Sequence, residues 1–492
     1  MKKYIIALDL GTTNIKAGIY DNKLNEISIY SDKVNYKNAK PFVEFDPEEY
    51  WQNCRDIIRK NIEKSKIDPK NISSLALTGQ AETLVMIDKN NEVLGDAISW
   101  MDNRSTDECE YLKKTFNSEE SYIITGQPEI ITTWPITKIL WIKRNQESRF
   151  KKVCKYLLLK DFIVFKLTGR IVTEFSVSSF TYYLDIINKR YWKDIIDYVG
   201  VDQEQLPLLE EPGKNIQGHV PEAAKDLNLN SDLIVNIGML DHFSGMIGVG
   251  NIEHGILSES TGTVMAIATI LKKPDKKLFP IPFHYGPFKD NYSLLPVCES
   301  GGICFEWFKD NFYPDKGFKE IDLEIEESPK YEKNDRLTFL PYILGANSPE
   351  YNNNIKGIFY GITINHKRYD FARSVLEGIS FLLKKNIDFL SKNGLEVKKI
   401  ISMGGAAKSE LWNKMKADII QQKIHIPYYK ESTLYGASIL AAAGLHNSSV
   451  DKILKNIKLS SKEMQPDANK RDYYHDSYEL FSKLYEKLSD LN

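Results

Sequence analysis

The sequence contains few cysteines, and their spacing excludes two kinds of covalent framework. There are five cysteines among 492 residues, and none forms a C-x-x-C pair. An odd number of cysteines in a long chain without such pairs fits neither a disulfide framework nor a structural zinc site. We therefore expect free thiols, a reducing compartment and a cytoplasmic location.

Long apolar runs and an excess of basic residues are also missing. No stretch is long enough to cross a bilayer as a helix. The formal net charge is −2, whereas a protein that binds nucleic acid needs a basic face. We expect neither a membrane nor a nucleic acid among the partners of the chain, and the sequence leaves a homodimer open.

The two common glycine-rich nucleotide motifs do not follow the first expected strand. Neither G-x-x-x-x-G-K-[ST] nor G-x-G-x-x-G is found there. What is present is an ordinary globular composition, with 42% hydrophobic and 27% charged residues. A chain of 492 residues with this composition is long enough for two large domains or more.

The strongest local pattern lies at residues 4–21, where two apolar runs flank an Asp-x-Gly-Thr-Thr segment. This pattern predicts two strands joined by a tight turn, whose N–H groups and hydroxyls can face a phosphate. The glycine allows close approach of an anion because it has no Cβ, and the aspartate suits Mg²⁺, which prefers hard oxygen ligands. A plain hairpin is the alternative. The candidate residues are Asp9, Gly11, Thr12, Thr13 and Lys16.

Polar residues follow several short apolar strands in the first half of the chain. A strand at 72–77 runs into the polar segment 78–83, and another strand ends near residue 98. Open α/β sheets bind their ligands at such strand ends. Helix caps and surface ion pairs are the alternative interpretation. The candidate substrate contacts are Gln80, Glu82, Asp102 and Arg104.

Two other segments of the first half have recognisable chemistry. Asp46-Pro47 predicts a helix start, with aspartate as N-cap and proline at the first helical position. Residues 173–185 are rich in serine, threonine and aromatic residues. That composition suits a loop or lid over a polar ligand, or equally a surface hairpin.

The second half repeats the pattern of the first. An apolar strand at 233–240 ends in Asp241, and residues 256–268 form a second strand, Gly-Thr turn and strand. A unit repeated half a chain apart suggests a duplication and two similar domains. We expect the domains to span residues 1–243 and 244–492.

A double glycine marks a further candidate site. Residues 399–409 read as a strand, a turn at Gly404-Gly405 and the start of a helix. Two glycines at such a turn let a flat ring pack against the backbone. This segment is therefore a candidate site for a nucleotide base.

In their order and spacing, these pieces resemble the FGGY carbohydrate kinases of the actin-like, ribonuclease H-like ATPase superfamily. The resemblance covers nearly the whole chain. It implies an α/β fold with two ribonuclease H-like domains facing across a cleft, with ATP largely on the second and the sugar or polyol largely on the first. The segments that carry it are residues 9–16, 78–80, 100–104, 167–169, 238–241, 261–263, 376–378, 404–412 and 436–445.

The resemblance also implies the reaction, which is ATP-dependent phosphorylation of a hydroxyl of a small sugar (a ketopentose or ketohexose) or polyol. Asp241 matches the general base, and Asp9 matches the residue that holds Mg²⁺ together with Asp241. Phosphoryl transfer needs mainly alignment and charge neutralisation, which these groups supply. A helix N-cap is the alternative role for Asp241. The residues implied at the phosphates are Thr12, Thr13, Gly262 and Thr263, and those along the adenosine are Gly404, Gly405 and Lys408.

The chain departs from the family pattern in its substrate region. Residues 80–83 resemble the glycerol kinase motif more than the Gln-Met-His of xylulose kinases, but Ala81 replaces an arginine and removes its fork of donors. Trp134 is a candidate aromatic wall, His242 stands where glycerol kinases carry glutamine, and residues 345–347 replace a Gly-Glu-Arg. The expected substrate contacts are Gln80, Glu82, Asp102, Trp134, Asp241 and His242.

Two other functions stay open from the sequence. One is glycerol kinase itself, which the alanine at position 81 disfavours. The other is an actin- or chaperone-like ATPase, in which the nucleotide drives assembly or conformational change. The second polar cluster at the strand ends of the first half favours a kinase, because it suits a small hydroxylated ligand.

Overall fold

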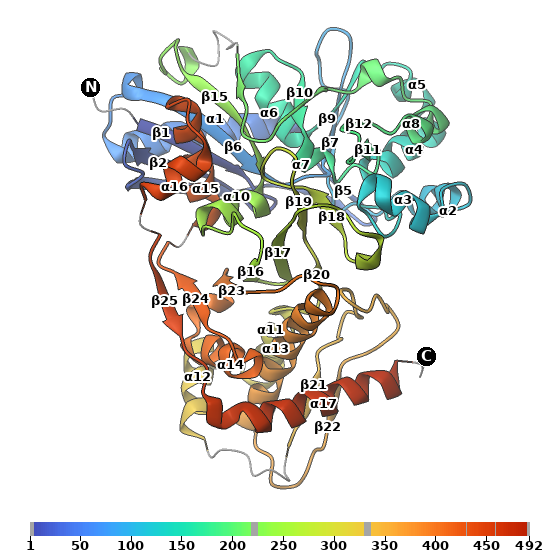
Figure 1. Cartoon of the computed structure of the whole chain (residues 1–492). Helices are drawn as coiled ribbons and strands as arrows, with labels where there is room; N and C mark the ends of the chain where they lie inside the picture. The colour runs from blue at the N-terminus through green and yellow to red at the C-terminus, as the bar shows by residue number, and fades with distance from the viewer. Residues whose placement is uncertain (1–3, 218–224, 329–335, 430, 458, 490–492) are drawn as a thin grey trace. The chain divides into compact units, whose positions relative to one another are not determined.

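The structure is a computed structural model that describes residues 4–217, 225–328, 336–429, 431–457 and 459–489 (Figure 1). The chain divides into two compact units that interleave along the sequence. The division after residue 243 that the sequence predicts stays a prediction. Unit 1 consists of residues 1–250, 271–293 and 431–459, and unit 2 consists of residues 251–270, 294–430 and 460–492.

A six-stranded sheet forms the centre of unit 1. Its first hairpin is confirmed, because the strands on either side of the Gly-Thr turn pair antiparallel. The next two strands along the sheet run parallel to the first strand of the hairpin. The order across the sheet is β14 (Asn215–Ile216), β15 (Ile234–Leu240), β6 (Ile72–Gly79), β1 (Tyr4–Leu10), β2 (Asn14–Asp21) and β3 (Glu26–Lys33).

One face of this sheet packs on helices α1 (Pro47–Ser65) and α6 (Leu159–Thr168), and apolar residues of these helices and strands share one buried core. Side chains of a strand alternate between faces, so β1 sends every second residue into this core. Helix α1 begins as predicted, because the Asp46 side chain accepts hydrogen bonds from two N–H groups of the first turn.

The other face packs on helices α10 (Asp241–Gly248) and α15 (Ser432–Leu445). In Figure 1 the orange-red α15 lies beside the blue β1 and β2, although the segments are far apart in the sequence. A Cβ on Gly248 would lie 2.0 Å from the Ser432 carbonyl oxygen, so the two helices touch through their backbones. This contact requires glycine.

A second sheet, several helices and some short strands complete unit 1. The order of that sheet is β4 (Lys37–Ala39), β5 (Phe42–Phe45), β8 (Ala97–Ile98), β7 (Leu84–Ile87) and β9 (Lys155–Leu158). The helices are α2 (Thr106–Lys113), α3 (Ser118–Thr125), α4 (Pro135–Asn145), α5 (Glu147–Phe150), α7 (Phe175–Ser178), α8 (Lys193–Val199) and α16 (Val450–Lys455). The remaining strands of unit 1 are β10 (Val172–Glu174), β11 (Leu184–Asp185), β12 (Arg190–Tyr191), β13 (Leu208–Glu210), β18 (Phe283–Tyr285) and β19 (Tyr292–Leu294).

Residues 173–185 are buried throughout, so the expectation of a surface hairpin there is wrong. Their polar groups are satisfied inside the protein. The carboxylate of Glu174 caps α7, and the hydroxyl of Thr181 donates to the carbonyl of Ser178. Local hydrogen bonds of this kind let a polar segment enter a core.

Unit 2 contains the second predicted hairpin, which is confirmed as an antiparallel pair. Within unit 2, the consecutive strands of the sheet around it are β17 (Met265–Leu271), β16 (Ile256–Thr261), β23 (Lys399–Met403), β24 (Ile424–Pro427) and β25 (Ser461–Met464). Other strands are β20 (Val297–Cys298), β21 (Thr338–Leu340) and β22 (Ile358–Tyr360). The helices are α11 (Ile303–Phe312), α12 (Phe318–Glu327), α13 (Arg368–Lys392), α14 (Glu410–Ile420) and α17 (Arg471–Leu488).

All five cysteines are free, as expected from their spacing. Within the described ranges, no helix combines the length and the apolar character that crossing a membrane requires.

Candidate active site

The register of three parallel strands brings the predicted metal-binding and catalytic carboxylates together in unit 1. Thr78 of β6 lies opposite Asp9 of β1 on one side and Met239 of β15 on the other. The three strands therefore end at the same edge of the sheet, and Asp241 directly follows β15. The charge on Asp241 contributes to the raised pKa of Asp9, so the two carboxylates are near neighbours.

Gly238 allows β15 to approach β6 closely just before Asp241. Its φ is +67°, and a Cβ on it would lie 1.4 Å from the carbonyl oxygen of Leu77. The strand pairing shifts register at this point. Only glycine fits this backbone, which carries the chain from β15 into α10.

Asp9 is a buried carboxylate with an unpartnered oxygen. Its Oδ1 is buried and has no hydrogen-bond partner among the described residues. Burial, together with the nearby charge of Asp241, raises its pKa to about 8. Lys16, opposite Asp9 on β2, lowers that pKa but is itself paired with Glu431 at 2.7 Å.

A site with two carboxylates suits Mg²⁺ better than it suits a metal whose ligands all come from protein side chains. The described residues contain no group of three or more histidine, cysteine, aspartate or glutamate side chains that could hold a metal ion. Mg²⁺ usually binds one or two carboxylates and takes its other ligands from phosphates and water. The unpartnered oxygen of Asp9, with Asp241 beside it, matches this requirement.

The first Gly-Thr turn is held by three aromatic side chains. Tyr50 donates its hydroxyl to the Gly11 carbonyl at 3.1 Å, and Tyr36 donates to the Thr12 carbonyl at 2.9 Å. The Trp100 indole N–H donates to the Thr12 hydroxyl at 2.9 Å. The carbonyls are thus occupied, whereas the N–H groups of the turn donate to no described residue.

The last residue of this turn also points its backbone carbonyl into the protein. The Thr13 carbonyl accepts from the N–H of Val34 at 3.0 Å, and the residue is otherwise exposed. The predicted phosphate residues of unit 1 therefore form one turn with its carbonyls bound and its N–H groups free, as an anion site requires.

Gln80 and Glu82 occupy a tight bend after β6. The Thr83 hydroxyl donates to the Gln80 side-chain oxygen at 2.7 Å, and Glu82 has the left-handed φ of +61°. Burial raises the pKa of Glu82 to about 8, with a further contribution from the charge of Asp241 and an opposing one from Lys138. Glu82 therefore belongs to the same carboxylate cluster as Asp9 and Asp241.

Lys138 of α4 is a member of the site that sequence reasoning missed. Its side chain is buried, and its ammonium donates to the Thr133 carbonyl at 2.8 Å. Burial lowers its pKa to about 7, and Glu82 and Asp102 oppose this shift. The sequence signal that could have found it is a lysine among the apolar positions of the segment that forms α4.

His242 and His284 form a second feature near Asp241. His284 stacks on Phe180 with ring centroids 4.0 Å apart, and its Nδ1 lies 3.2 Å from the side-chain nitrogen of Gln127. Burial, and the charge that His242 can carry, lower the pKa of His284 to about 3. His284 is thus neutral, and no local pattern in the sequence marks it.

Trp134 is buried at the start of α4, in an aromatic cluster. Its indole N–H donates to the Glu129 carbonyl at 2.8 Å, and its ring lies 6.5 Å from that of Tyr182. The residue lies near Lys138 in the sequence and on the same helix end. Its predicted role as a wall of the sugar pocket stays a prediction.

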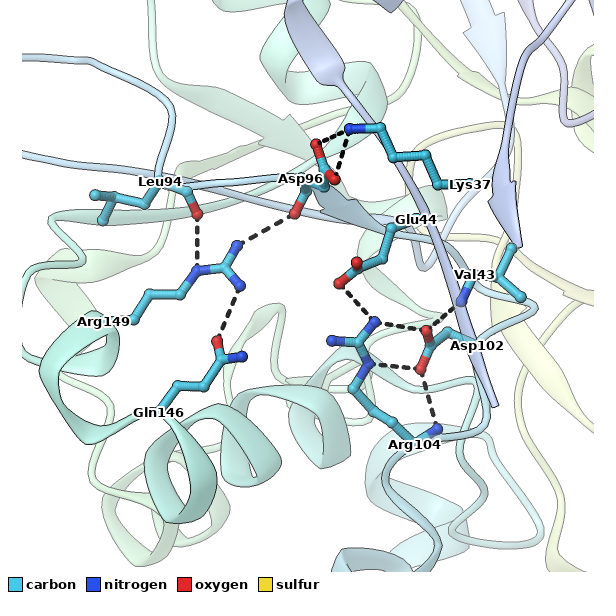
Figure 2. Close-up of polar contacts among 9 residues, drawn as sticks. All are labelled: Lys37, Val43, Glu44, Leu94, Asp96, Asp102, Arg104, Gln146 and Arg149. Atoms are coloured by element: carbon cyan, nitrogen blue, oxygen red, sulfur yellow. Dashed lines mark hydrogen bonds and ion pairs between the residues drawn. The ribbon is translucent and has the colours of Figure 1, made fainter. Parts of the chain in front are cut away.

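Asp102 and Arg104 are bound to each other and to neighbouring residues (Figure 2). The Arg104 Nε donates to Asp102 at 2.8 Å, and the N–H of Val43 donates to the same carboxylate at 2.6 Å. Arg104 also bonds Glu44 at 2.6 Å. These contacts match the ion-pair alternative, and a direct substrate contact by Asp102 stays a prediction.

In unit 2, a pocket of about 420 Å³ is lined by four of the five nucleotide residues that were predicted in this unit. This volume lies within the range of small-ligand sites. Gly404 lies directly before the lining residue Gly405, and the aromatic walls were not predicted. The lining residues are Thr261, Gly262, Thr263, Gly302, Phe305, Glu306, Phe318, Lys319, Asp322, Gly405, Ala406, Lys408, Ser409 and Trp412.

Glycines shape the wall of this pocket. Gly404 has a φ of +81°, and a Cβ on it would lie 3.0 Å from the Thr261 carbonyl oxygen. The Gly302 N–H donates to the Gly262 carbonyl at 3.0 Å. A Cβ on Gly262 would meet nothing within 4 Å, so this glycine faces open space. The turn is therefore packed from behind and open in front, which suits an approaching anion.

Comparisons with known proteins match both halves of the chain to one family. The N-terminal domain of the FGGY family of carbohydrate kinases matches residues 4–248, and its C-terminal domain matches residues 258–445. The xylulose kinase of Bacillus subtilis (strain 168) is 28% identical over 494 residues, which cover 100% of this chain and 98% of that protein.

Solved structures agree with this match over the full length. The gluconate kinase from Lactobacillus acidophilus has a TM-score of 0.91 and 28% identity, covering 100% of this chain and 99% of that one. The ligand-bound xylulose kinase from Lactobacillus acidophilus has a TM-score of 0.90 and 27% identity, with 99% of each chain covered. The predicted α/β fold with two actin-like ATPase domains is confirmed, and kinases of this family use ATP to phosphorylate small sugars. The chain belongs to the FGGY family of carbohydrate kinases.

Proposed function

We propose that this protein transfers the γ-phosphoryl group of ATP to a hydroxyl of a small neutral sugar, a ketopentose or ketohexose, or of a polyol. The observation that supports this most strongly is the cluster of Asp9, Glu82 and Asp241 at one edge of the unit 1 sheet. The free N–H groups of the adjacent Gly-Thr turn supply a phosphate site next to it.

Asp241 acts as the general base in this proposal. One of its oxygens accepts the N–H of His242 at 2.6 Å, and the other accepts no hydrogen bond from a described residue. The second oxygen is therefore available to take the proton of the attacking hydroxyl. His242 and Glu82 hold the sugar in place beside it.

Asp9 and Asp241 would hold Mg²⁺. The ion, when bound, neutralises charge on the phosphates and orients them for transfer. The turn of Gly11, Thr12 and Thr13 donates N–H groups to the phosphates. Lys16 and Glu431 form an ion pair beside Asp9. This pair keeps the positively charged ammonium of Lys16 near Asp9.

The nucleotide is assigned to the unit 2 pocket. Gly262 and Thr263 contact the phosphates, and Gly404, Gly405 and Lys408 lie along the adenosine. The pocket is lined by aromatic side chains that suit a flat base, and its volume of about 420 Å³ is in the range for such a ligand.

The charges in unit 1 favour a neutral substrate over a sugar acid. Three carboxylates gather at this edge of the sheet, and Lys138, with a pKa near 7, is only partly charged at neutral pH. A substrate carboxylate would therefore lack a fully charged cation to pair with at this edge of the sheet, which disfavours a sugar acid. Both a xylulose kinase and a gluconate kinase are about equally similar to the chain, so the identities do not choose between the two classes.

Two alternatives are weaker. For glycerol kinase, the buried Ala81 lacks the donor fork that the family motif carries at this position. For an actin- or chaperone-like ATPase, the polar groups of Gln80, Glu82 and Lys138 beside Asp241 have no evident use. We place the kinase in the cytoplasm, a proposal that the five free cysteines support.

The test is ADP release by the purified protein with Mg²⁺ and ATP. The panel contains xylulose, ribulose, fructose, erythritol, glycerol and gluconate, each against a no-sugar blank. We expect large stimulation by one neutral ketose or polyol. Stimulation by gluconate alone would overturn the proposal that the substrate is a neutral sugar or polyol. Stimulation by none, together with filament formation or peptide binding, would favour the ATPase.

A further inference from the structure

A buried ion pair lies behind the second Gly-Thr turn in unit 2. Glu259 of β16 is 0% exposed and Lys416 of α14 is 1% exposed, and the lysine ammonium contacts the glutamate Oε1. Lysine and glutamate are almost never this deeply buried unless they are paired. Such pairs contribute little stability compared with apolar residues of the same size, so stability alone does not account for this one.

Hydrogen bonds connect this ion pair to the turn. The Thr261 hydroxyl donates to Glu259 Oε2 at 2.6 Å. Ser402, which faces Glu259 across the β16–β23 pairing, donates its hydroxyl to Glu259 Oε1 and accepts from the Lys416 ammonium at 3.3 Å. Two strands and a helix are thereby joined to the side chain of Thr261, the last residue before the glycine of the turn.

Only the ends of this network reach the wall of the 420 Å³ pocket. Thr261 lines the pocket at one end. At the other end, the Lys416 ammonium lies 5.0 Å from the ring centroid of Trp412, which also lines it. Neither Glu259 nor Lys416 is a lining residue. Their effect on a ligand would therefore act through Thr261 and Trp412.

We propose that Glu259 and Lys416 are positioning residues for the nucleotide phosphates, an inference that rests on the proposed function of this pocket. Glu259 holds the Thr261 hydroxyl and so sets the orientation of the turn. Lys416 neutralises Glu259, so that no uncompensated negative charge is buried behind an anion site. Each residue thus needs the other.

A pair of neutral double variants separates positioning from bulk packing. In E259Q/K416M both charges are removed, but position 259 keeps an acceptor for Thr261. In E259L/K416M the charges and the acceptor are both removed. We measure the affinity for MgADP by calorimetry, the KM values for ATP and sugar, and the thermal midpoint of unfolding.

We expect E259Q/K416M to bind MgADP within about threefold of wild type and E259L/K416M to bind it at least tenfold more weakly. The sugar KM should stay within twofold in both variants. T261V exchanges the hydroxyl for a methyl group and should lose as much affinity for MgADP as E259L/K416M. It takes the place of that double variant if the double variant does not fold. K414M is the matched control, because Lys414 lies on α14 but is 41% exposed and pairs with Asp418 at 2.6 Å.

Two results would overturn the proposal in different ways. Equal MgADP affinity in wild type, both double variants and T261V would show that the network only packs the core. A wild-type protein that does not bind MgADP at all would overturn the proposed nucleotide pocket, and this inference with it.

Discussion

Asp9 and Glu82 are each held in an arrangement that lowers the stability of the folded protein. An unpartnered buried carboxylate oxygen costs about 1–3 kcal/mol, and a left-handed backbone at a residue other than glycine costs about 1–2 kcal/mol. Asp9 shows the first and Glu82 the second. Such costs cluster at functional sites, where the unfavourable arrangement serves binding or catalysis. Both residues lie beside Asp241, so these energetically unfavourable arrangements are concentrated around the proposed general base.

The first prediction concerns Asp241. Asp241→Asn should lower kcat by about 10²–10⁴-fold, because the amide cannot take the proton of the substrate hydroxyl. The affinity for ADP, measured by calorimetry, should change little. Asp107→Asn, at an exposed position on α2, is the matched control and should retain full activity. A near wild-type rate in Asp241→Asn would contradict the mechanism.

The second prediction concerns Glu82. Above pH 8, where the Glu82 carboxylate is ionised, Glu82→Gln removes the charge but keeps the length of the side chain at a left-handed position. A hydrogen bond to a charged group contributes about 1.5–3 kcal/mol, so the sugar KM should rise by about 10–100-fold. The KM for ATP should stay within a few-fold in the same steady-state assay. If the ATP KM rose and the sugar KM did not, Glu82 would belong to the nucleotide site.

The third prediction is a pH dependence of stability through Asp9. Its pKa is raised from 3.8 to about 8, so between these values the folded state holds a proton that the unfolded state has lost. The raised pKa therefore lowers stability as pH rises through this window, by up to about 1.4 kcal/mol per pH unit. Asp9→Asn removes this titration.

Chemical unfolding of wild type and Asp9→Asn, without Mg²⁺, measures this effect. We expect wild type to lose stability relative to the variant as pH rises from 5 to 8. Contributions from His284 and Lys138, whose pKa values are lowered, are common to both proteins and cancel in the difference. Parallel stability curves for the two proteins would show that Asp9 is not a buried acid.

At the scale of elements, the second Gly-Thr turn depends on close backbone contacts made by glycines of other elements. In unit 2, Gly404 packs on Thr261, and Gly302 packs on Gly262, where a Cβ would lie 2.2 Å from the carbonyl oxygen. These contacts bring the end of β23 and the start of α11 against one turn. The geometry of the turn is therefore a property of several elements rather than of its own sequence.

The fourth prediction tests this packing with two glycines of similar backbone. Gly404→Ala and Gly394→Ala both place alanine at a φ above +80°, which costs about 1–2 kcal/mol of stability. A Cβ at Gly394 would meet nothing within 4 Å, whereas one at Gly404 would press on Ser260 and Thr261. Both variants should unfold at lower temperature, but only Gly404→Ala should lose affinity for MgADP. Equal affinities would show that this contact does not shape the pocket.

At the scale of the whole molecule, the residues predicted for the two ligands are distributed over both units. The carboxylates and the first turn belong to unit 1, and the second turn and the nucleotide pocket belong to unit 2. Unit 1 also includes α15, from near the end of the chain, so the units are linked by several crossings of the backbone.

The fifth prediction concerns the compactness of the protein when both ligands are bound. Excluding water protects the γ-phosphate from hydrolysis, so a kinase of this kind gains from closing before transfer. We expect the radius of gyration from small-angle X-ray scattering to fall when sugar and a non-hydrolysable ATP analogue are both present. Either ligand alone should have a smaller effect. Scattering curves unchanged by the ligand pair would argue against closure.

Features with a short-range signal could be predicted from the sequence. Both hairpins and the Asp46 cap follow from periodicity and turn chemistry within about twenty residues, and the structure confirms them. The burial of residues 173–185 could not be predicted, because it depends on hydrogen-bond partners that the fold supplies.

The sequence alone determined the two Gly-Thr turns and the strands that lead to Asp9 and Asp241, because these features depend on neighbours along the chain. Only the tertiary structure decided which distant charges meet, such as Lys138 with Glu82 and Lys416 with Glu259. Such pairs leave no local pattern, since each side chain satisfies a partner more than 50 residues away. Their burial, and with it their effect on charge and position, exists only once the elements have packed.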